Sequence, residues 1–456
     1  MVIESALRFD AKKWKRHIRP YTGPREMWPH SARIKQHNHS QIAEILLKYR
    51  SRFRKEQAVL GIDIPEEITV VGKRHIQPRH VEDFNHIVSS EALSYDPRIL
   101  SFRESSNMAM VGQILGQGFA PEMLHAVPNQ KLFYMSKVEG PSYLERIVNA
   151  APKGRLGVIS DLVRVVARFV GTATAHKKEF LDEYDFAEDR DLREGRRFNT
   201  LGRRIQRIAT AVQIKSESRL RTLHELWPKF GLKEVMAHGE ANSAHYFRST
   251  GGTIAIDWES LGLYDQPRDL CDALIIGAIG PNQLLDGRNF ADLVFKYLAY
   301  EHAYGLSDLR ETEEVLIQIE TLDEFNLPRY LQRETGLDQE AYGNFMLGLY
   351  AMAIEKGIQL ANTSSADRFD IEYTLERLFD RVANSQEHFY DSTNPKELRE
   401  YFSILGELLT ESGYIKIGGP TLDKIAKGES PSVEGVMSGR DALVTWSYIN
   451  NPISKD

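Results

Sequence analysis

Two carboxylates flank a short predicted hairpin in the middle of the chain. Glu240 lies in the segment 237–247, which reads as a loop followed by a short strand, and Asp257 ends a second strand after the Gly251-Gly252 turn. A hairpin of this kind brings a loop carboxylate near a strand-end carboxylate. One of them can bind a hard divalent cation while the other orients or deprotonates a hydroxyl group. The pattern therefore predicts a polar reaction centre.

The segment after the hairpin predicts the start of a helix. Tyr264-Asp265-Gln266-Pro267-Arg268-Asp269-Leu270 places Asp269 where it can cap a helix that continues through Ala273 and Leu274.

The order of these motifs resembles the aminoglycoside phosphotransferase and choline kinase superfamily, small-molecule kinases that share the protein-kinase fold. The resemblance rests on His238-Gly239-Glu240, the hairpin, Ile256-Asp257-Trp258-Glu259 and the helix entry that ends at Asp269-Leu270. The segment Met135 to Leu144 is similar to that family's hinge, where the adenine ring binds. The resemblance covers roughly residues 65–360.

The resemblance implies a role for each matching position. Asp257 would chelate the Mg²⁺ that bridges the nucleotide phosphates, and His238 would brace the catalytic loop. Glu240 stands at the position of the base that orients the acceptor hydroxyl. His245 stands where the family has an asparagine that binds a second Mg²⁺. In the hinge, Lys137, Val138 and Glu139 would contact the base of the nucleotide, either ATP or GTP.

The chain departs from the family pattern at two of these positions. The family has Asp and Asn where this chain has Glu240 and His245. Glutamate is one methylene longer than aspartate, and histidine offers nitrogen to a cation that prefers oxygen. Asn242 lies nearby in sequence and is an alternative oxygen ligand. Two functions therefore stay open: phosphoryl transfer to a hydroxyl group of a small molecule, or a kinase-like pseudoenzyme that binds nucleotide or a protein partner without transfer.

The resemblance also calls for a basic residue near the α- and β-phosphates. Lys73, within the strand pattern Val70-Val71-Gly72-Lys73, is the first choice, and Arg103 is the rival. An exposed lysine at the edge of a sheet is an equally good reading of Lys73.

Hydrophobic periodicity predicts the elements that position these residues. Residues 1–40 read as an irregular arm and residues 41–58 as a basic helix. The pattern then predicts strands at 67–76, 98–102 and 132–138, with a helix through Met108 and Val111. From Gly157 onward the pattern becomes helical, with further helices around 290–304, 311–320, 339–360, 368–384 and 396–411.

These elements predict an α+β, bilobal, protein-kinase-like fold with a helical C-terminal extension. The expected divisions are a basic arm and helix at 1–60, a small β-rich amino lobe at 61–140, a helical carboxy lobe with the catalytic loop at 141–360, and a helical extension and tail at 361–456.

Composition narrows the class of protein. The 456 residues are 42% hydrophobic and 27% charged, which is typical of a globular chain rather than a disordered one. Cys271 is the only cysteine, so an intrachain disulfide or a thiolate metal cluster is excluded. No apolar run is long enough to span a membrane and the N-terminus does not resemble a signal peptide, so we expect a cytoplasmic protein.

Charge is unevenly distributed. Residues 1–60 contain 14 Lys and Arg against 5 Asp and Glu, whereas the remainder contains 44 against 59. A basic arm on an acidic body fits contact with a protein or a nucleic acid, or packing against its own body. The histidines at 30, 37, 39, 75, 80 and 86 match no zinc-binding spacing and are expected on the solvated surface.

Overall fold

The computed structural model describes residues 27–36, 40–49, 67–75, 97–116, 118–127, 131–186, 217–249, 252–275, 287–323, 326–363, 368–411, 413 and 415–428. The chain divides into two compact units. The first comprises Met1–Gly140 and Phe247–Ser260, and the second comprises Pro141–Tyr246 and Leu261–Asp456.

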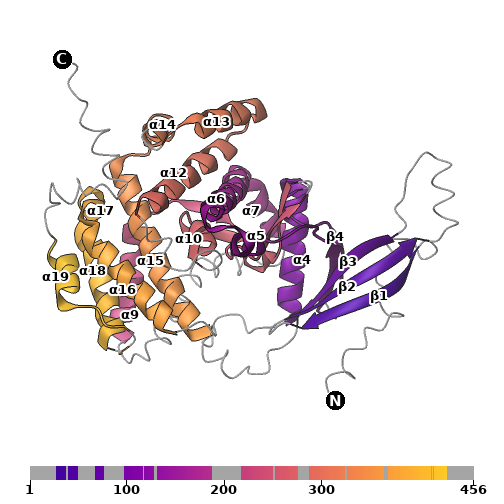
Figure 1. Cartoon of the computed structure of the whole chain (residues 1–456), viewed down its shortest axis with the longest axis horizontal. Coiled ribbons are helices and arrows are strands. Elements are labelled where there is room, and N and C mark those ends of the chain that lie inside the picture. Colours follow the sequence, from indigo (N-terminus) through magenta and orange to yellow (C-terminus); the bar gives the residue numbers. More distant parts are fainter. Residues whose placement is uncertain are drawn as a thin grey trace. The chain divides into compact units, whose positions relative to one another are not determined.

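The first unit is built on an antiparallel sheet of five strands in the order β1-β2-β3-β5-β4 (Figure 1). Helix α4 packs against β3, β4 and β5. A separate two-stranded sheet, β7 with β8, is followed by the 3₁₀ turn η3, which also contacts α4. The bounds are β1 (Met27–Gln36), β2 (Ser40–Tyr49), β3 (Glu67–His75), α4 (Pro97–Ile114), β4 (Met123–Val127), β5 (Leu132–Ser136), β7 (Tyr246–Ser249), β8 (Gly252–Ala255) and η3 (Trp258–Ser260).

The predicted helix at 41–58 is wrong over residues 41–49, which belong to β2 and pair with β1 and β3, while residues 50–58 lie outside the described residues. Ile42, Ile45 and Leu46 fit helical spacing, and that pattern misled the prediction. The apolar residues described as buried in β2 are Ala43 and Ile45, which alternate along the strand and face the core. The irregular arm predicted for 1–40 is likewise wrong over 27–36, which form β1. The rest of that arm lies outside the described residues, apart from Ser40, which begins β2.

The predicted strand at 98–102 is also wrong, because these residues form the first turns of α4. Ser101, Glu104, Ser105 and Met108 are all buried, which is the i, i+3, i+4, i+7 spacing of one helix face. The strands predicted at 67–76 and 132–138 are confirmed as β3 and β5.

The second unit is mainly helical (Figure 1). Its bounds are α5 (Tyr143–Asn149), α6 (Pro152–Ala175), α7 (Lys177–Phe186), α9 (Glu217–Leu226), η2 (Trp227–Phe230), β6 (Glu234–Ala237), β9 (Gly262–Asp265), α10 (Arg268–Ile275), α12 (Gly287–Tyr304), α13 (Leu309–Thr321), α14 (Asn326–Thr335), α15 (Gln339–Thr363), α16 (Arg368–Asn384), α17 (Gln386–Asp391), α18 (Pro395–Glu411) and α19 (Gly419–Lys427). The helices predicted from periodicity are confirmed here, α6 among them.

Close helix packing in this unit depends on small residues. A Cβ added to Gly171 of α6 would lie 2.3 Å from the carbonyl oxygen of Glu301 on α12, so only glycine lets the two helices approach this closely. The core of α6 includes Leu162, Val166 and Val170, none of which is exposed. Helix α6 also packs against β6 of the two-stranded sheet that β6 forms with β9.

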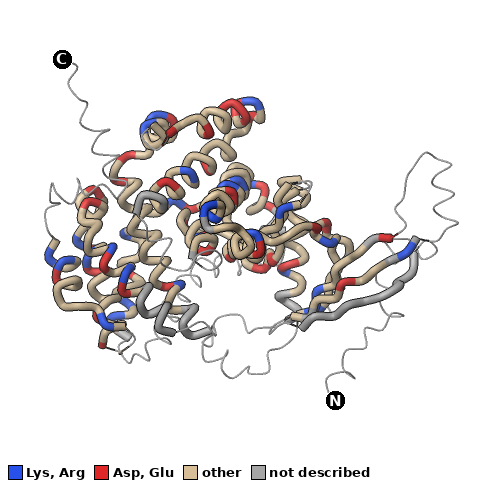
Figure 2. The backbone as a smooth tube through the Cα atoms, viewed as in Figure 1, with Lys and Arg blue, Asp and Glu red and all other residues tan. Residues whose placement is uncertain are grey.

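Charged residues of both signs are spread over the described helices and strands rather than gathered on one element (Figure 2). None of the described helices combines the length and the apolar character that crossing a bilayer requires.

Candidate functional site

Strand β3 turns two polar side chains into the core of the first unit. Lys73 and His75 are buried, whereas Arg74 between them is exposed, as the alternation of a strand requires. The expectation that His75 lies on the solvated surface is therefore wrong. The spacing of histidines carries no information about which face of a strand is covered, and here α4 packs against β3.

The ammonium of Lys73 lies between two carboxylates. Its Nζ is 2.9 Å from Oε1 and 2.8 Å from Oε2 of Glu104, and 2.6 Å from Oδ1 of Asp257. His75 Nε2 lies 2.9 Å from Oε2 of the same glutamate. We refer to Lys73, His75, Glu104 and Asp257 as the lysine cluster. Burial alone would lower the pKa of Lys73, but the carboxylates of Asp257 and Glu104 outweigh burial and raise it, so the lysine stays charged.

Helix α4 holds both ends of the lysine cluster. Glu104 projects from it toward Lys73, and Asn107, three residues further along, donates a 2.7 Å hydrogen bond to the carbonyl oxygen of Trp258. Trp258 follows Asp257 directly and is fully buried, with its indole N–H donating to Ala255 at 2.9 Å. The position of Asp257 is thus fixed by its neighbour as well as by Lys73.

The backbone of Asp257 adopts a conformation that is rare for a residue with a side chain. Its φ angle is +68°, in the left-handed region. Such a conformation costs on the order of 1–3 kcal/mol and is found more often at functional sites than elsewhere. It occurs at the turn that directs the Asp257 carboxylate onto Lys73.

The lysine cluster has the composition of a phosphate and cation site. Lys73 is a buried, permanently charged donor, and the side chain of Asp257 is 22% exposed. Mg²⁺ prefers oxygen ligands and keeps several waters, so one partly exposed carboxylate fits it. His75, Glu104 and Glu259 also place ligand atoms within 4.8 Å of one another. Because both oxygens of Glu104 already contact Lys73 or His75, we assign no metal to that group.

The second unit contains the predicted catalytic loop. Strand β6 ends at Ala237, and the backbone N–H groups of His238 and Gly239 donate to the two carboxylate oxygens of Asp269 at 2.8 and 2.9 Å. Asp269 belongs to the first turn of α10 and is completely buried. The sequence predicts it as a helix cap, but both its oxygens hold the loop.

Arg268 also holds the catalytic loop in place. Arg268 donates to the carbonyl oxygen of Gly239 at 3.2 Å and lies 3.4 Å from Asp272, which also contacts Lys356 of α15 at 3.0 Å. Burial, followed by the nearby Asp272 carboxylate, raises the pKa of Asp269 to about 7.

The two positions that depart from the family pattern contact each other. The N–H of Glu240 donates to Nδ1 of His238 at 3.3 Å, and Nδ1 of His245 lies 3.1 Å from the carbonyl oxygen of Glu240. The side-chain oxygen of Asn242 accepts from the N–H of Ala244 at 3.0 Å. The loop is thus closed by its own polar groups. An imidazole nitrogen is a poor ligand for Mg²⁺, so we assign no metal to His245.

His238 packs inside the second unit. It is fully buried, and its ring lies 6.4 Å from that of Phe169 and 5.8 Å from that of Tyr246, centroid to centroid. These contacts, together with its N–H bond to Asp269, fit a residue that braces the loop.

The predicted hinge follows β5. Lys137 lies 3.9 Å from both Glu44 and Glu139, and Val138 is half-buried. Gly140 ends the first unit with a φ of +104°, and a Cβ there would lie 2.0 Å from the carbonyl oxygen of Arg248.

Sequence reasoning found Lys73 and Asp257 but missed Glu104. A signal was present: Glu104 precedes Met108 by four residues and Val111 by seven, so it shares the apolar face of the same helix. An acidic residue on such a face needs a buried partner. Arg103, the rival of Lys73, lies half-buried on α4, and Lys73 is the residue that joins the two carboxylates.

Searches of protein-family models and of curated proteins return no match. The chain is similar to several solved structures. The aminoglycoside phosphotransferase APH(2'')-Ib bound to ADP is 11% identical, with 76% of this chain and 99% of that one covered and a TM-score of 0.38. An ethanolamine kinase from Plasmodium vivax is 11% identical over 79% and 84%, with a TM-score of 0.38.

An amicoumacin kinase in complex with AMP-PNP, Ca²⁺ and Ami is 11% identical over 92% of this chain and 98% of that one, with a TM-score of 0.36.

Proposed function

We propose that the chain is a small-molecule phosphotransferase that moves the γ-phosphoryl group of ATP or GTP to a hydroxyl group. The observation that carries the proposal is the lysine cluster, in which a strand lysine is held by a helix glutamate and by an aspartate after a hairpin. Protein kinases use this set of groups to bind phosphates and magnesium.

In this proposal each residue has one task. Lys73 contacts the α- and β-phosphates while Glu104 holds its ammonium in place, and Asp257 binds Mg²⁺. The bound metal supplies neutralisation of the charge on the transferring group. Glu240 accepts a hydrogen bond from the acceptor hydroxyl and orients its oxygen. The bond from the γ-phosphorus to the bridging oxygen breaks, a bond to the acceptor oxygen forms, and the hydroxyl proton is released.

A direct test measures nucleotide binding and transfer separately. The full chain is titrated with Mg-ATP and Mg-GTP in a thermal-shift assay, and ADP or GDP release is followed with a panel of hydroxylated small molecules. A nucleotide at 100 times its Kd should stabilise the fold by about 2.7 kcal/mol. Asp257→Asn should lose both signals. Asp161→Asn, an exposed carboxylate on α6, should keep them.

A pseudoenzyme is the second candidate function, favoured by the Glu240 and His245 pair and by the bond that joins them. It predicts stabilisation by nucleotide with no product release above the Asp257→Asn background. Absence of nucleotide stabilisation would contradict both phosphoryl transfer and a pseudoenzyme that binds nucleotide, and would leave a pseudoenzyme that binds a protein partner.

A further inference from the structure

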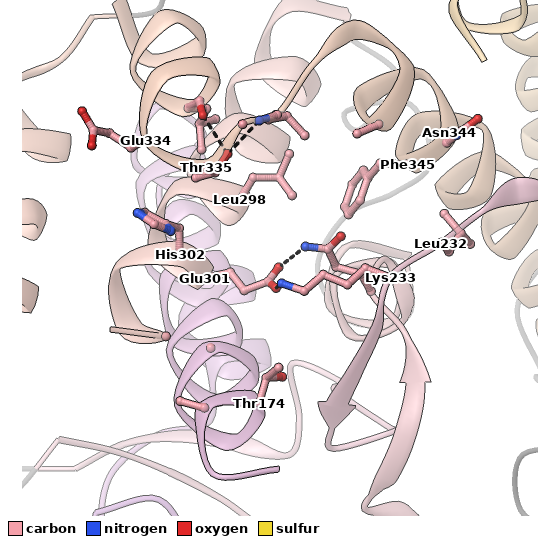
Figure 3. Close-up of a pocket in the computed structure, with 18 of the residues that line it drawn as sticks. Thr174, Leu232, Lys233, Leu298, Glu301, His302, Glu334, Thr335, Asn344 and Phe345 are labelled. Atoms are coloured by element: carbon pink, nitrogen blue, oxygen red, sulfur yellow. Dashed lines mark hydrogen bonds and ion pairs between the residues drawn. The ribbon is translucent and has the colours of Figure 1, made fainter. Parts of the chain in front are cut away.

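A cavity of about 520 Å³ lies inside the helical unit and is lined by residues of α6, α12, α14 and α15 (Figure 3). Pockets for small organic ligands span roughly 300–1,000 Å³, so its size suits such a ligand. Leu232, Leu298 and Phe345 supply apolar surface, and Figure 3 shows Glu301, Lys233 and His302 on the same cavity.

The cavity is separate from the catalytic loop. Lys233 directly precedes β6, and Gln266 directly follows β9. At this end of the two strands Glu234 pairs with Asp265, and the N–H of Gln266 donates to the carbonyl oxygen of Lys233 at 2.8 Å. The loop begins at His238, beyond the other end of β6. Five residues of extended chain span about 16 Å, so a ligand in the cavity does not occupy the loop.

Glu301 is the charged centre of the cavity. It is only 4% exposed, and one of its oxygens accepts a 2.7 Å hydrogen bond from Nε2 of Gln266. The other oxygen lies 3.6 Å from Nζ of Lys233, whose side chain is 63% exposed. That separation is longer than a hydrogen bond, and an exposed lysine can turn into solvent at little cost. Burial raises the pKa of Glu301, and the charge of Lys233 and the hydrogen bond from Gln266 offset this only in part.

The other lining groups favour a cation over an anion. The lining includes the carboxylates of Glu301 and Glu334, one ammonium from Lys233, and the imidazole of His302. Burial lowers the pKa of His302, which keeps the imidazole neutral at pH 7. An anionic ligand would face the buried Glu301 carboxylate, which is unfavourable. An ammonium gains a short, charge-assisted hydrogen bond there.

We propose that this cavity binds a small amphipathic organic amine. Its ammonium contacts Glu301 in place of Lys233, and its hydrocarbon part packs against Leu232, Leu298 and Phe345. The proposal concerns a second site and does not depend on the proposed transfer reaction.

The experiment compares 2-phenylethylamine with its uncharged counterpart 2-phenylethanol on the full chain, by calorimetric titration. The amine should bind at least tenfold more tightly than the alcohol. Glu301→Gln keeps the shape of the side chain and should reduce amine affinity at least tenfold while leaving alcohol affinity unchanged. Glu313→Gln, an exposed acid on α13, should change neither.

A second variant covers the case in which Glu301→Gln does not fold. Leu337 lies half-buried in the cavity lining, and Leu337→Trp narrows the space while retaining Glu301. It should weaken binding of both probes. Saturating Mg-ATP and the Asp257→Asn variant should leave amine binding intact, which separates this result from the outcome of the transfer assay. Three results would overturn the proposal. They are equal affinities for amine and alcohol, amine binding that is unchanged in Glu301→Gln or Leu337→Trp, and no saturable binding of the amine.

Discussion

The ammonium of Lys73 lies 2.6 Å from the carboxylate of Asp257, although the two residues are 184 positions apart in the chain. Both belong to the first unit, which recruits the segment Phe247–Ser260 from far along the sequence. The contact joins the middle strand of the five-stranded sheet to the turn after β8. It is the relationship on which the proposed function depends.

Replacing Lys73 should lower the free energy of unfolding, because Glu104 is then buried without its ammonium partner. Lys73→Met leaves the carboxylate of Glu104, only 1% exposed, without its ammonium, and loss of one member of a buried pair costs about 3–5 kcal/mol. Adding Glu104→Gln removes the uncompensated charge, so the double variant should be more stable than the sum of the single changes predicts. Urea unfolding of the full chain measures this coupling. Arg74→Met, the exposed neighbour on β3, should change stability by no more than about 0.5 kcal/mol. Strictly additive effects would argue against the pair.

Restoring the family residues should raise transfer. Glu240→Asp with His245→Asn shortens the carboxylate by one methylene and supplies an amide oxygen. The amide N–H of Asn can still donate to the carbonyl oxygen of residue 240, as His245 is placed to do. Because a misplacement of about 1 Å can cost 10²-fold in rate, we expect kcat to rise by about 10- to 100-fold with nucleotide affinity unchanged. Product release measures kcat and thermal shift measures binding. A lower kcat would mean that Glu240 is itself adapted to the acceptor.

Acid should destabilise the fold through His388. This residue of α17 is buried against the rings of Tyr342 and Tyr350, and burial followed by the charge of Arg381 lowers its pKa to about 3. The unfolded chain binds the proton near pH 6.5, so the stabilising contribution is complete above that pH and is lost as the pH falls toward 3. The loss is at most about 1.4 kcal/mol per pH unit. Urea unfolding at several pH values should show this slope in the wild type and a shallower one in His388→Gln. Identical slopes would exclude His388 as the cause.

Two glycine replacements should change stability in opposite directions. Gly140→Ala places a Cβ 2.0 Å from the carbonyl oxygen of Arg248 at a φ of +104°, which should destabilise the fold by more than about 2 kcal/mol. Gly154→Ala adds a methyl group to an exposed turn of α6 with nothing within 4 Å, and should stabilise it by about 0.5–1 kcal/mol. Thermal unfolding of both variants measures the difference. A tolerated Gly140→Ala would mean that the hinge backbone relaxes.

Asp257 could be predicted because Ile256-Asp257-Trp258-Glu259 is a short motif whose residue types limit the chemistry, whereas Lys73 was chosen only because the resemblance calls for a basic residue near the phosphates. Glu104 could not be paired with Lys73 in the same way, since the pairing depends on how α4 packs against β3. Strand β2 was misread because Ile42, Ile45 and Leu46 have the i, i+3, i+4 spacing of one helix face, whereas in the strand Ile45 lies on the face opposite Ile42 and Leu46. Asp269 was predicted to cap the start of a helix, but its carboxylate in fact accepts hydrogen bonds from the loop. A helix cap and a residue that holds a loop use the same carboxylate at the same helix position, so the sequence does not distinguish them.

The discontinuity of the first unit has a consequence for protein synthesis. The sheet, Lys73 and Glu104 are translated before Gly140, whereas Asp257 follows only after the intervening part of the second unit. At a translation rate of roughly 5–20 residues per second, roughly 5–20 s pass between the synthesis of Gly140 and that of Asp257. During that time the nascent sheet contains a strand lysine whose second carboxylate does not yet exist. The first unit can therefore complete its folding only after the catalytic loop has been translated.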